Sequence, residues 1–358
     1  MRACDVCLRR ARLVADLAGH LDHLHAKRGM LDEVFALSDE DLVAALVPSR
    51  RDRRRMLSPG AVGEEASRAA GLAATCRHDG AYPAALRDLP GAPAALFTSS
   101  GERLVALCAE PAVAIVGARR ASEYGVEVAR SLGRSLAATG VTVVSGMALG
   151  VDSAAHAGAL EAGGRTVAVL AGGADVPYPA SKRSLHREIA ARGTVVSEMP
   201  PGFPPRRWGF PARNRIIAVL GAVTVVVEAA ERSGALITAR VARELGRDVA
   251  AVPGRITSPL AAGANALLRD GAHVVDGPQA VLDVLFGVGA RRAEPVRDGR
   301  DLAPRLREVL AAVREGRDTV GALVGADGNA TAVVTALGEL ELAGYVRRGA
   351  GGAYVPLS

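Results

Sequence analysis

Aromatic and arginine side chains gather in one stretch of the chain, residues 200–215. Three of the eleven aromatic residues, Phe203, Trp208 and Phe210, lie within eight positions and are interleaved with arginines. Ring faces among guanidinium groups are what proteins use to hold single-stranded nucleic acid, since each stacked base contributes about 1–3 kcal/mol. The stretch therefore predicts a surface for single-stranded nucleic acid. In the alternative interpretation the rings pack against the rest of the fold and hold the loop in place. This alternative is stronger for Phe203 than for Phe210.

Glycine-rich turns follow several of the predicted strands and could approach a phosphate closely. They contain Gly117, Gly146, Gly150, Gly234 and Gly254. Glycine lets the backbone come close to a ligand, and free N–H groups at the start of a helix attract anions. Because the carboxyl ends of parallel strands meet at one edge of a sheet, the turns together predict a phosphate-binding rim. For any single turn, the alternative that glycine serves only the turn geometry is sufficient.

The familiar motifs of nucleotide-binding enzymes and hydrolases are absent from the sequence. There is no Gly-x-x-x-x-Gly-Lys-Ser/Thr, and the first turn reads Gly117-Ala-Arg-Arg-Ala instead of Gly-x-Gly-x-x-Gly. Nucleophile-elbow and zinc-hydrolase motifs are also missing. The candidate acid–base residues are scattered along the chain. Asp152 and His156 are four positions apart and could pair on a helix, but such a pair more often orders a loop than takes part in catalysis. These candidates are Asp152, His156, Glu198 and Glu228. We expect no catalytic activity.

One spacing near the N-terminus fits a Cys2His2 zinc site, namely Cys4, Cys7, His20 and His25. Leu17 stands where a zinc finger has its core leucine. Ala11 replaces the core aromatic residue, no β-hairpin signal precedes the helix, and His23 would serve equally well as a ligand. We therefore expect neither a metal site nor a cofactor. Cys76 and Cys108 are interpreted as ordinary small buried residues.

Short β-branched runs alternate with helical stretches from about residue 103 to 287. Strands that are apolar on both faces and separated by helices are typical of βαβ units, so we predict an α/β fold, a Rossmann-like doubly wound and mostly parallel sheet. The predicted strands are Val113–Gly117, Val141–Gly146, Val167–Gly172, Thr194–Met199, Val223–Ala230, Val249–Gly254 and His273–Val275. The predicted helices are Gly125–Ala138, Asp152–Ala162, Leu185–Ala191, Asn214–Leu220, Leu236–Leu245 and Ala264–Arg269.

Four parts of the chain are predicted. They are a helical N-terminal region over 1–100, a Rossmann-like DNA-binding domain over 101–288, a linker over 289–303 and a winged-helix domain over 304–358. In the first part, Ser38 is a candidate N-cap for a helix over 37–46. The basic run Arg50–Arg55 is interpreted as a solvated linker or helix face, with a DNA-backbone contact as the alternative.

The last part has three short helical runs followed by a candidate β-ribbon, which is the winged-helix pattern. Its third helical run, residues 329–344, contains Glu339 and Glu341 and no Arg or Lys. A helix that enters the DNA groove is usually basic, so protein contact or a structural role is the preferred interpretation.

Composition limits the class of protein. With 49% hydrophobic residues the chain can bury a core, and its apolar runs are too short for a membrane helix. No secretory signal is seen, and four cysteines make no disulfide framework, so we expect a cytoplasmic protein. The net charge of +6 permits a polyanionic partner. Of the 44 basic residues 42 are arginine, which looks like the codon bias of a GC-rich genome, so arginine positions matter more than their number.

A series of ordered motifs resembles the DNA-processing protein A family (DprA, also called Smf) over roughly residues 80–287. The motifs begin at Val113, Val143, Thr166, Tyr178, Ser197, Phe210, Val227, Ser233, Gly246 and Val252. Among them are Val-Val-Ser-Gly-Met-Ala-Leu-Gly-Val-Asp-Ser-Ala-Ala-His and Phe-Pro-Ala-Arg-Asn-Arg-Ile-Ile. So many motifs in order are a specific signal, and the helical N-terminal region and winged-helix tail fit the family's common layout.

The resemblance implies a homodimeric, sequence-independent single-stranded-DNA-binding protein without catalysis. It further implies a recombination mediator that loads RecA recombinase onto incoming or processed strands, displacing single-strand-binding protein, during natural transformation. The residues expected at the DNA site are Gly117, Arg119, Gly146, Gly150, Lys182, Phe210, Arg213, Asn214, Arg215, Ser233, Gly234 and Gly254. The chain departs from the family pattern at Lys182, where Asn is usual, at Ala235, where Ser is usual, and over 261–265, which could weaken single phosphate contacts.

Two other functions remain alternatives. Rossmann-like sheets with glycine-rich rims also make nucleotide phosphoribohydrolases, but these need a catalytic Glu beside a Gly-Gly-x-Gly-Thr turn, which the nearest match, residues 170–175, lacks. A sensor of a small nucleotide is the second alternative, and it should prefer a mononucleotide to an oligomer.

Overall fold

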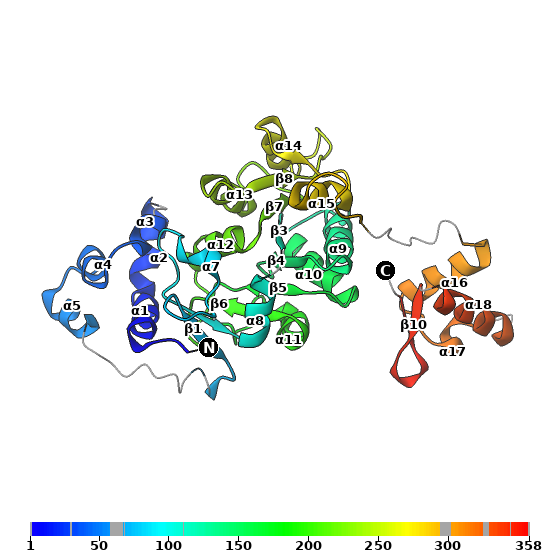
Figure 1. The fold of residues 1–358 in the computed structure, drawn as a ribbon, viewed down its shortest axis with the longest axis horizontal. Helices are drawn as coiled ribbons and strands as arrows, with labels where there is room; N and C mark the ends of the chain where they lie inside the picture. Colours follow the sequence, from blue (N-terminus) through cyan, green and yellow to red (C-terminus); the bar gives the residue numbers. More distant parts are fainter. Residues whose placement is uncertain are drawn as a thin grey trace. The chain divides into compact units, whose positions relative to one another are not determined.

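The computed structural model describes residues 2–28, 31–57, 67, 69–109, 111–293, 302–324, 329–343 and 345–356. The chain forms two compact units, Met1–Ala293 and Glu294–Ser358 (Figure 1). Among the described residues, no helix is both long and apolar enough to cross a membrane. Most of the predicted linker over 289–303 lies outside the described residues.

The first unit is built on a nine-stranded sheet with the order β1-β2-β6-β5-β4-β3-β7-β8-β9. Strands β3 to β9 are parallel, whereas β1 and β2 are antiparallel additions at one edge. All seven predicted strands are present. The bounds are β1 Ala73–Cys76, β2 Ala95–Thr98, β3 Ala112–Val116, β4 Thr142–Ser145, β5 Thr166–Val169, β6 Thr194–Ser197, β7 Val223–Val226, β8 Asp248–Ala251 and β9 His273–Val274.

Helices cover both faces of this sheet. The bounds are α7 Ala84–Arg87, α8 Gly101–Cys108, α9 Glu123–Ala138, α10 Val151–Glu161, α11 Arg183–Arg192, α12 Gly209–Leu220, α13 Gly234–Glu244, α14 Ala262–Arg269 and α15 Pro278–Phe286, with the 3-10 turn η1 over Ala180–Lys182. Helices α12 and α13 pack on one face, and α9, α10 and α15 pack on the opposite face (Figure 1). Burial on both faces explains why β3 to β7 are mostly apolar and why every position of these strands is buried.

The sequence-based start of α12 was wrong by five residues. The helix begins at Gly209 and not at Asn214, so Pro211 lies in its first turn. Proline is tolerated there because its missing N–H would have no partner within the helix. The correction places Phe210 and Arg213 on the same helix.

The N-terminal region is helical only in part. Its helices are α1 Asp5–Asp16, α2 Ala18–Arg28, α3 Leu31–Phe35, α4 Asp39–Leu46 and α5 Arg50–Leu57. The side chain of Ser38 accepts the N–H of Asp41 and caps α4, as predicted. Helix α5 carries the basic run and buries none of its residues, which confirms the solvated helix face. Strands β1 and β2, inside the region expected to be helical, instead extend the sheet, because short apolar runs can pair at its edge.

The second unit contains three helices and a two-stranded antiparallel sheet. The bounds are α16 Pro304–Arg314, α17 Val320–Leu323, α18 Ala330–Leu342, β10 Val346–Arg348 and β11 Tyr354–Pro356. Leu306, Leu310, Leu337, Leu340 and Tyr354 bury one small core. This order of elements matches the predicted one, and the assignment to a winged-helix domain stays a prediction.

Candidate functional site

A cavity of about 660 Å³ opens beyond the carboxyl ends of the neighbouring strands β3 and β7. The sheet connections run in opposite directions from this pair of strands, which is where ligands bind in doubly wound folds. The lining includes seven of the predicted residues, namely Gly117, Arg119, Phe210, Arg213, Asn214, Ser233 and Gly234. Three arginines and one acidic residue, Asp152, line the cavity, so it favours an anion.

One wall of the cavity is a stack of three side chains, of which Arg119 and Tyr178 come from two loops and Phe210 from the first turn of α12. The guanidinium of Arg119 lies over the Phe210 ring at 4.7 Å, and the Tyr178 ring lies 5.4 Å from that of Phe210. Arg119 is exposed, Phe210 is half-buried and Tyr178 is 45% exposed. Cation and ring faces that reach solvent can stack on further flat groups, including nucleobases.

The start of α13 forms a second wall. Ser233 is its N-cap, and the Ser233 hydroxyl accepts the N–H of Ala235 at 3.3 Å. A side chain added at Gly234 would meet no atom within 4 Å, so the backbone there is open. The Asn214 amide donates to the Gly234 carbonyl at 3.3 Å and ties α12 to this turn. An open helix N-terminus beside arginines is suited to a phosphate.

Arg213 is buried at the base of the cavity. Its guanidinium donates to the Gly146 and Val169 carbonyls and lies 3.8 Å from the Asp152 carboxylate. Burial lowers the pKa of Arg213 to about 10, against the opposing effect of Asp152, so the side chain is charged at neutral pH. Any side chain at Gly146 would overlap this guanidinium, which explains the glycine there. Arg213 therefore contributes positive charge to the cavity while its donors bind the protein.

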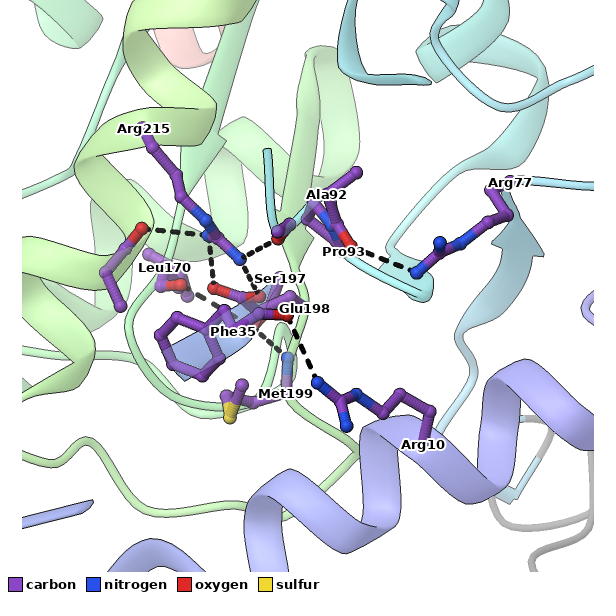
Figure 2. Close-up of polar contacts among 12 residues, drawn as sticks. Arg10, Phe35, Arg77, Ala92, Pro93, Leu170, Ser197, Glu198, Met199 and Arg215 are labelled. Atoms are coloured by element: carbon purple, nitrogen blue, oxygen red, sulfur yellow. Dashed lines mark hydrogen bonds and ion pairs between the residues drawn. The ribbon is translucent and has the colours of Figure 1, made fainter. Parts of the chain in front are cut away.

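The structure does not bring Arg215 to the cavity. Its guanidinium binds the Glu198 carboxylate through two hydrogen bonds of 2.7 and 2.8 Å, donates to the Gly91 carbonyl and lies 5.1 Å from the Phe35 ring (Figure 2). Both charged side chains are buried. Two residues after Arg213 on α12, the side chain points toward the N-terminal helices and serves packing.

Four further predicted residues, Gly146, Lys182, Gly150 and Gly254, also lie outside the cavity lining. Lys182 ends η1 and is half-buried. Gly150 has a φ of 75°, and a side chain there would collide with the Ala118 carbonyl, so its role is geometric. The Asn265 amide braces Gly254 through two hydrogen bonds of 3.0 and 3.1 Å. Direct DNA contacts from these residues stay predictions.

The stacking role suggested for Trp208 and Phe203 was wrong. Trp208 is fully buried, and its ring lies 5.9 Å from that of Phe35 and 6.4 Å from that of Phe203. These rings join the N-terminal helices to the start of α12, as the alternative interpretation held. Phe210 is the aromatic residue of the stretch that reaches the cavity.

The acid–base candidates are each held by internal contacts. Asp152 accepts the N–H groups of Gly146 and Ala148, and Glu228 accepts the N–H and hydroxyl of Ser122. His156 does not pair with Asp152; its Nδ1 lies 2.6 Å from the Thr166 hydroxyl, and burial lowers the pKa of His156 to about 3, which leaves the ring neutral.

Sequence reasoning missed three residues that line the cavity: Tyr178, Arg207 and His25. Tyr178 begins one of the family motifs, and an aromatic ring in a Pro-containing loop is a local signal that could have identified it. Arg207 lay in the aromatic–arginine stretch but was not singled out. His25 comes from α2, and no local pattern links that helix to the cavity.

The structure does not bring together the four residues of the Cys2His2 spacing. His20 and His25 lie on α2, thirteen or more residues beyond Cys7, and a helix of that length spans about 20 Å. Cys4 and Cys7 instead lie beside Cys76 and His78, so Cys76 is not an isolated buried residue.

The fold and the cavity define a class: a Rossmann-like α/β protein with an arginine-lined crevice at the point where the strand order of its sheet changes direction. Comparison with known families narrows the class further. The family DNA recombination-mediator protein A matches residues 73–286, more than half of the chain, and the chain belongs to this family.

Several relatives share this similarity. A putative DNA processing protein DprA from Mycobacterium tuberculosis is 48% identical over 191 residues, 53% of this chain, and the chain spans about half (49%) of that protein. Protein Smf from Escherichia coli is 40% identical over 68% of this chain and 67% of its own length. The structure of DprA from Streptococcus pneumoniae is 32% identical, covers 79% of this chain and 98% of its own, and superposes with a TM-score of 0.62.

A further solved structure, described as showing the single-stranded DNA binding mode of DNA processing protein A from Helicobacter pylori, is 30% identical. It covers 60% of this chain and 95% of its own, with a TM-score of 0.54.

Proposed function

We propose that the chain binds single-stranded DNA, without regard to sequence, in the cavity between β3 and β7. The observation that carries this proposal is the stack of Arg119, Phe210 and Tyr178 beside the open start of α13. A base can stack on the accessible rings while its phosphate meets the helix N-terminus and arginines. The printed description of the Helicobacter pylori relative supports the same ligand.

The proposal includes a role in recombination. The chain acts as a cytoplasmic, homodimeric mediator without catalysis, which loads RecA recombinase onto the strand in place of single-strand-binding protein. Family membership supports the mediator role, and the internal contacts of Asp152, His156, Glu198 and Glu228 support the lack of catalysis.

Fluorescence anisotropy with a labelled oligothymidine tests DNA binding. We expect tight binding that falls steeply with salt and that unlabelled duplex and mononucleotides compete poorly. Competition by a mononucleotide at equal concentration would favour the small-nucleotide sensor, and release of a free base would favour the phosphoribohydrolase.

Two exposed tyrosines provide a matched pair for this assay. Tyr178 is 45% exposed on the cavity wall, and Tyr124 is 52% exposed in the first turn of α9, outside the lining. Tyr178→Ala should weaken oligothymidine binding about fivefold or more, and Tyr124→Ala should not, since one lost stacking contact costs about 1 kcal/mol or more. Equal affinities of the two variants would contradict the assignment of the cavity.

RecA loading has its own assay. RecA filaments should form faster on DNA covered with single-strand-binding protein when the chain is added. If the chain bound DNA but did not accelerate filament formation, the single-stranded-DNA-binding proposal would stand and the mediator role would be contradicted.

A further inference from the structure

Four metal-ligand side chains converge outside the DNA cavity, where the start of α1 meets the end of β1. Cys4 is the N-cap of α1 and Cys7 lies in its first turn, Cys76 is the last residue of β1, and His78 lies in the turn that follows. Their sulfur and nitrogen ligand atoms all lie within 4.8 Å of one another. Two segments about seventy residues apart therefore bring three sulfurs and one imidazole to a single point.

Three of the six separations between ligand atoms are close to those of a tetrahedral zinc site. Zn–S bonds of about 2.3 Å and Zn–N bonds of about 2.0–2.1 Å imply ligand separations of about 3.8 Å between two sulfurs and about 3.6 Å between sulfur and nitrogen. In the structure the Cys4 and Cys76 sulfurs are 3.9 Å apart. The Nδ1 atom of His78 lies 3.4 Å from the Cys4 sulfur and 3.5 Å from the Cys7 sulfur.

The surroundings fit a structural site. Cys7 and Cys76 are buried and Cys4 is half-buried, in a cluster of apolar residues that includes Leu8 and Phe97. The backbone N–H of Cys4 points to the Cys76 sulfur at 3.4 Å, a contact that would orient and stabilise a ligating thiolate. Four protein ligands leave no open coordination position, which is the pattern of structural and not of catalytic zinc.

We propose that Cys4, Cys7, Cys76 and His78 bind one zinc ion that fastens α1 to β1. Three thiolates and one imidazole in tetrahedral arrangement select zinc over oxygen-preferring metals such as magnesium or calcium. The Cys-x-x-Cys pair at the start of a helix and the Cys-x-His pair after a strand supply two ligands each.

Helix α1, which carries two of the four ligands, also contacts other parts of the N-terminal region. Arg10 of α1 donates to the Phe35 carbonyl at 3.1 Å (Figure 2). It also donates to the Leu37 carbonyl at 2.8 Å and binds Asp39 at 2.7 Å. Phe35 in turn packs on Trp208 at the start of α12. Zinc bound at α1 would therefore stabilise the packing of the N-terminal helices against the sheet, independently of DNA binding in the cavity.

The test is the metal content of the untagged full-length chain, measured by inductively coupled plasma mass spectrometry. We expect about one zinc per chain. The variants His78→Ala and Cys76→Ser should lose most of it. Cys108→Ser is the matched cysteine control, since Cys108 is half-buried on α8 outside the cluster, and His20→Ala with His25→Ala is the histidine control; both should retain the zinc.

Several outcomes would overturn the proposal: a metal-free chain that takes up no zinc on refolding, stoichiometric iron in place of zinc, a disulfide among these cysteines, or zinc lost only with His20 and His25. His78 is exposed, so its alanine variant should fold even if Cys76→Ser does not. His78→Cys offers a rescue, because a fourth thiolate should restore zinc binding.

Cobalt substitution of the wild-type chain gives a second measurement. Co²⁺ should show intense tetrahedral ligand-field bands and sulfur-to-metal charge transfer that strengthens in His78→Cys. An octahedral spectrum would contradict the site. Chelation should lower the melting temperature of the wild-type chain and leave that of His78→Ala unchanged.

Discussion

Trp208 and Phe210 lie two residues apart, and so do Arg213 and Arg215, yet the members of each pair occupy different environments. Phe210 and Arg213 line the cavity, whereas Trp208 and Arg215 pack against the N-terminal helices. A helix turns about 100° per residue, so positions two apart face nearly opposite sides. The same residue types therefore line the cavity on one side of α12 and pack against the N-terminal helices on the other.

The largest expected effect is on the packing side. Arg215→Ala leaves the Glu198 carboxylate buried without its partner, so the free energy of unfolding should fall by about 3–5 kcal/mol in urea denaturation. The double variant Arg215→Met/Glu198→Leu should recover much of this loss. Weaker DNA binding at unchanged stability would instead place Arg215 in the DNA site.

The aromatic pair gives the next test. Trp208→Ala should lower the free energy of unfolding by about 3–5 kcal/mol, because a large buried ring is lost. Phe210→Ala should leave stability nearly unchanged and cost about 1–3 kcal/mol of binding, about 5- to 150-fold in Kd for oligothymidine. The contrast between Trp208 and Phe210 would be contradicted if the Phe210→Ala variant were unfolded or bound oligothymidine with wild-type affinity.

Gly146 and Gly234 offer the same contrast between a packed and an open position, with smaller expected changes in stability. A methyl group at Gly146 overlaps the Arg213 guanidinium, so Gly146→Ala should destabilise the chain by about 1–3 kcal/mol. Gly234 faces open space, so Gly234→Ala should stay within about 0.5 kcal/mol of the wild type. Thermal unfolding of both variants measures the difference, and equal melting temperatures would refute it.

The smallest effect concerns salt dependence. Arg119→Ala should reduce the slope of log Kd against log salt by about 0.7, the value for one lost phosphate contact on a single strand. Arg291→Ala is the matched control, since Arg291 also lies over a ring, that of Phe286 at 4.1 Å, but outside the cavity. An unchanged slope for Arg119→Ala would mean that this arginine meets no phosphate.

The sequence predicted the parallel sheet and seven of the residues that line the cavity. Alternating apolar runs specify strands and helices, and the topology of such sheets places Gly117, Arg119 and Ser233 at one edge. The patterns could not predict that His25 would join them, because its position depends on packing between distant segments.

By itself the sequence determined which chemical groups occur together along the chain. These are the glycine turns, the aromatic–arginine stretch and the Cys-x-x-Cys pair, each defined by spacing within a few residues. Tertiary structure decided which of these groups face solvent and which meet. Cys76 and His78 reach Cys4 and Cys7 only because β1 joins the sheet edge beneath α1. Arg215 turns away from the cavity because a buried carboxylate at the end of β6 pairs with it. Such choices depend on burial and long-range contact, which spacing along a chain does not encode.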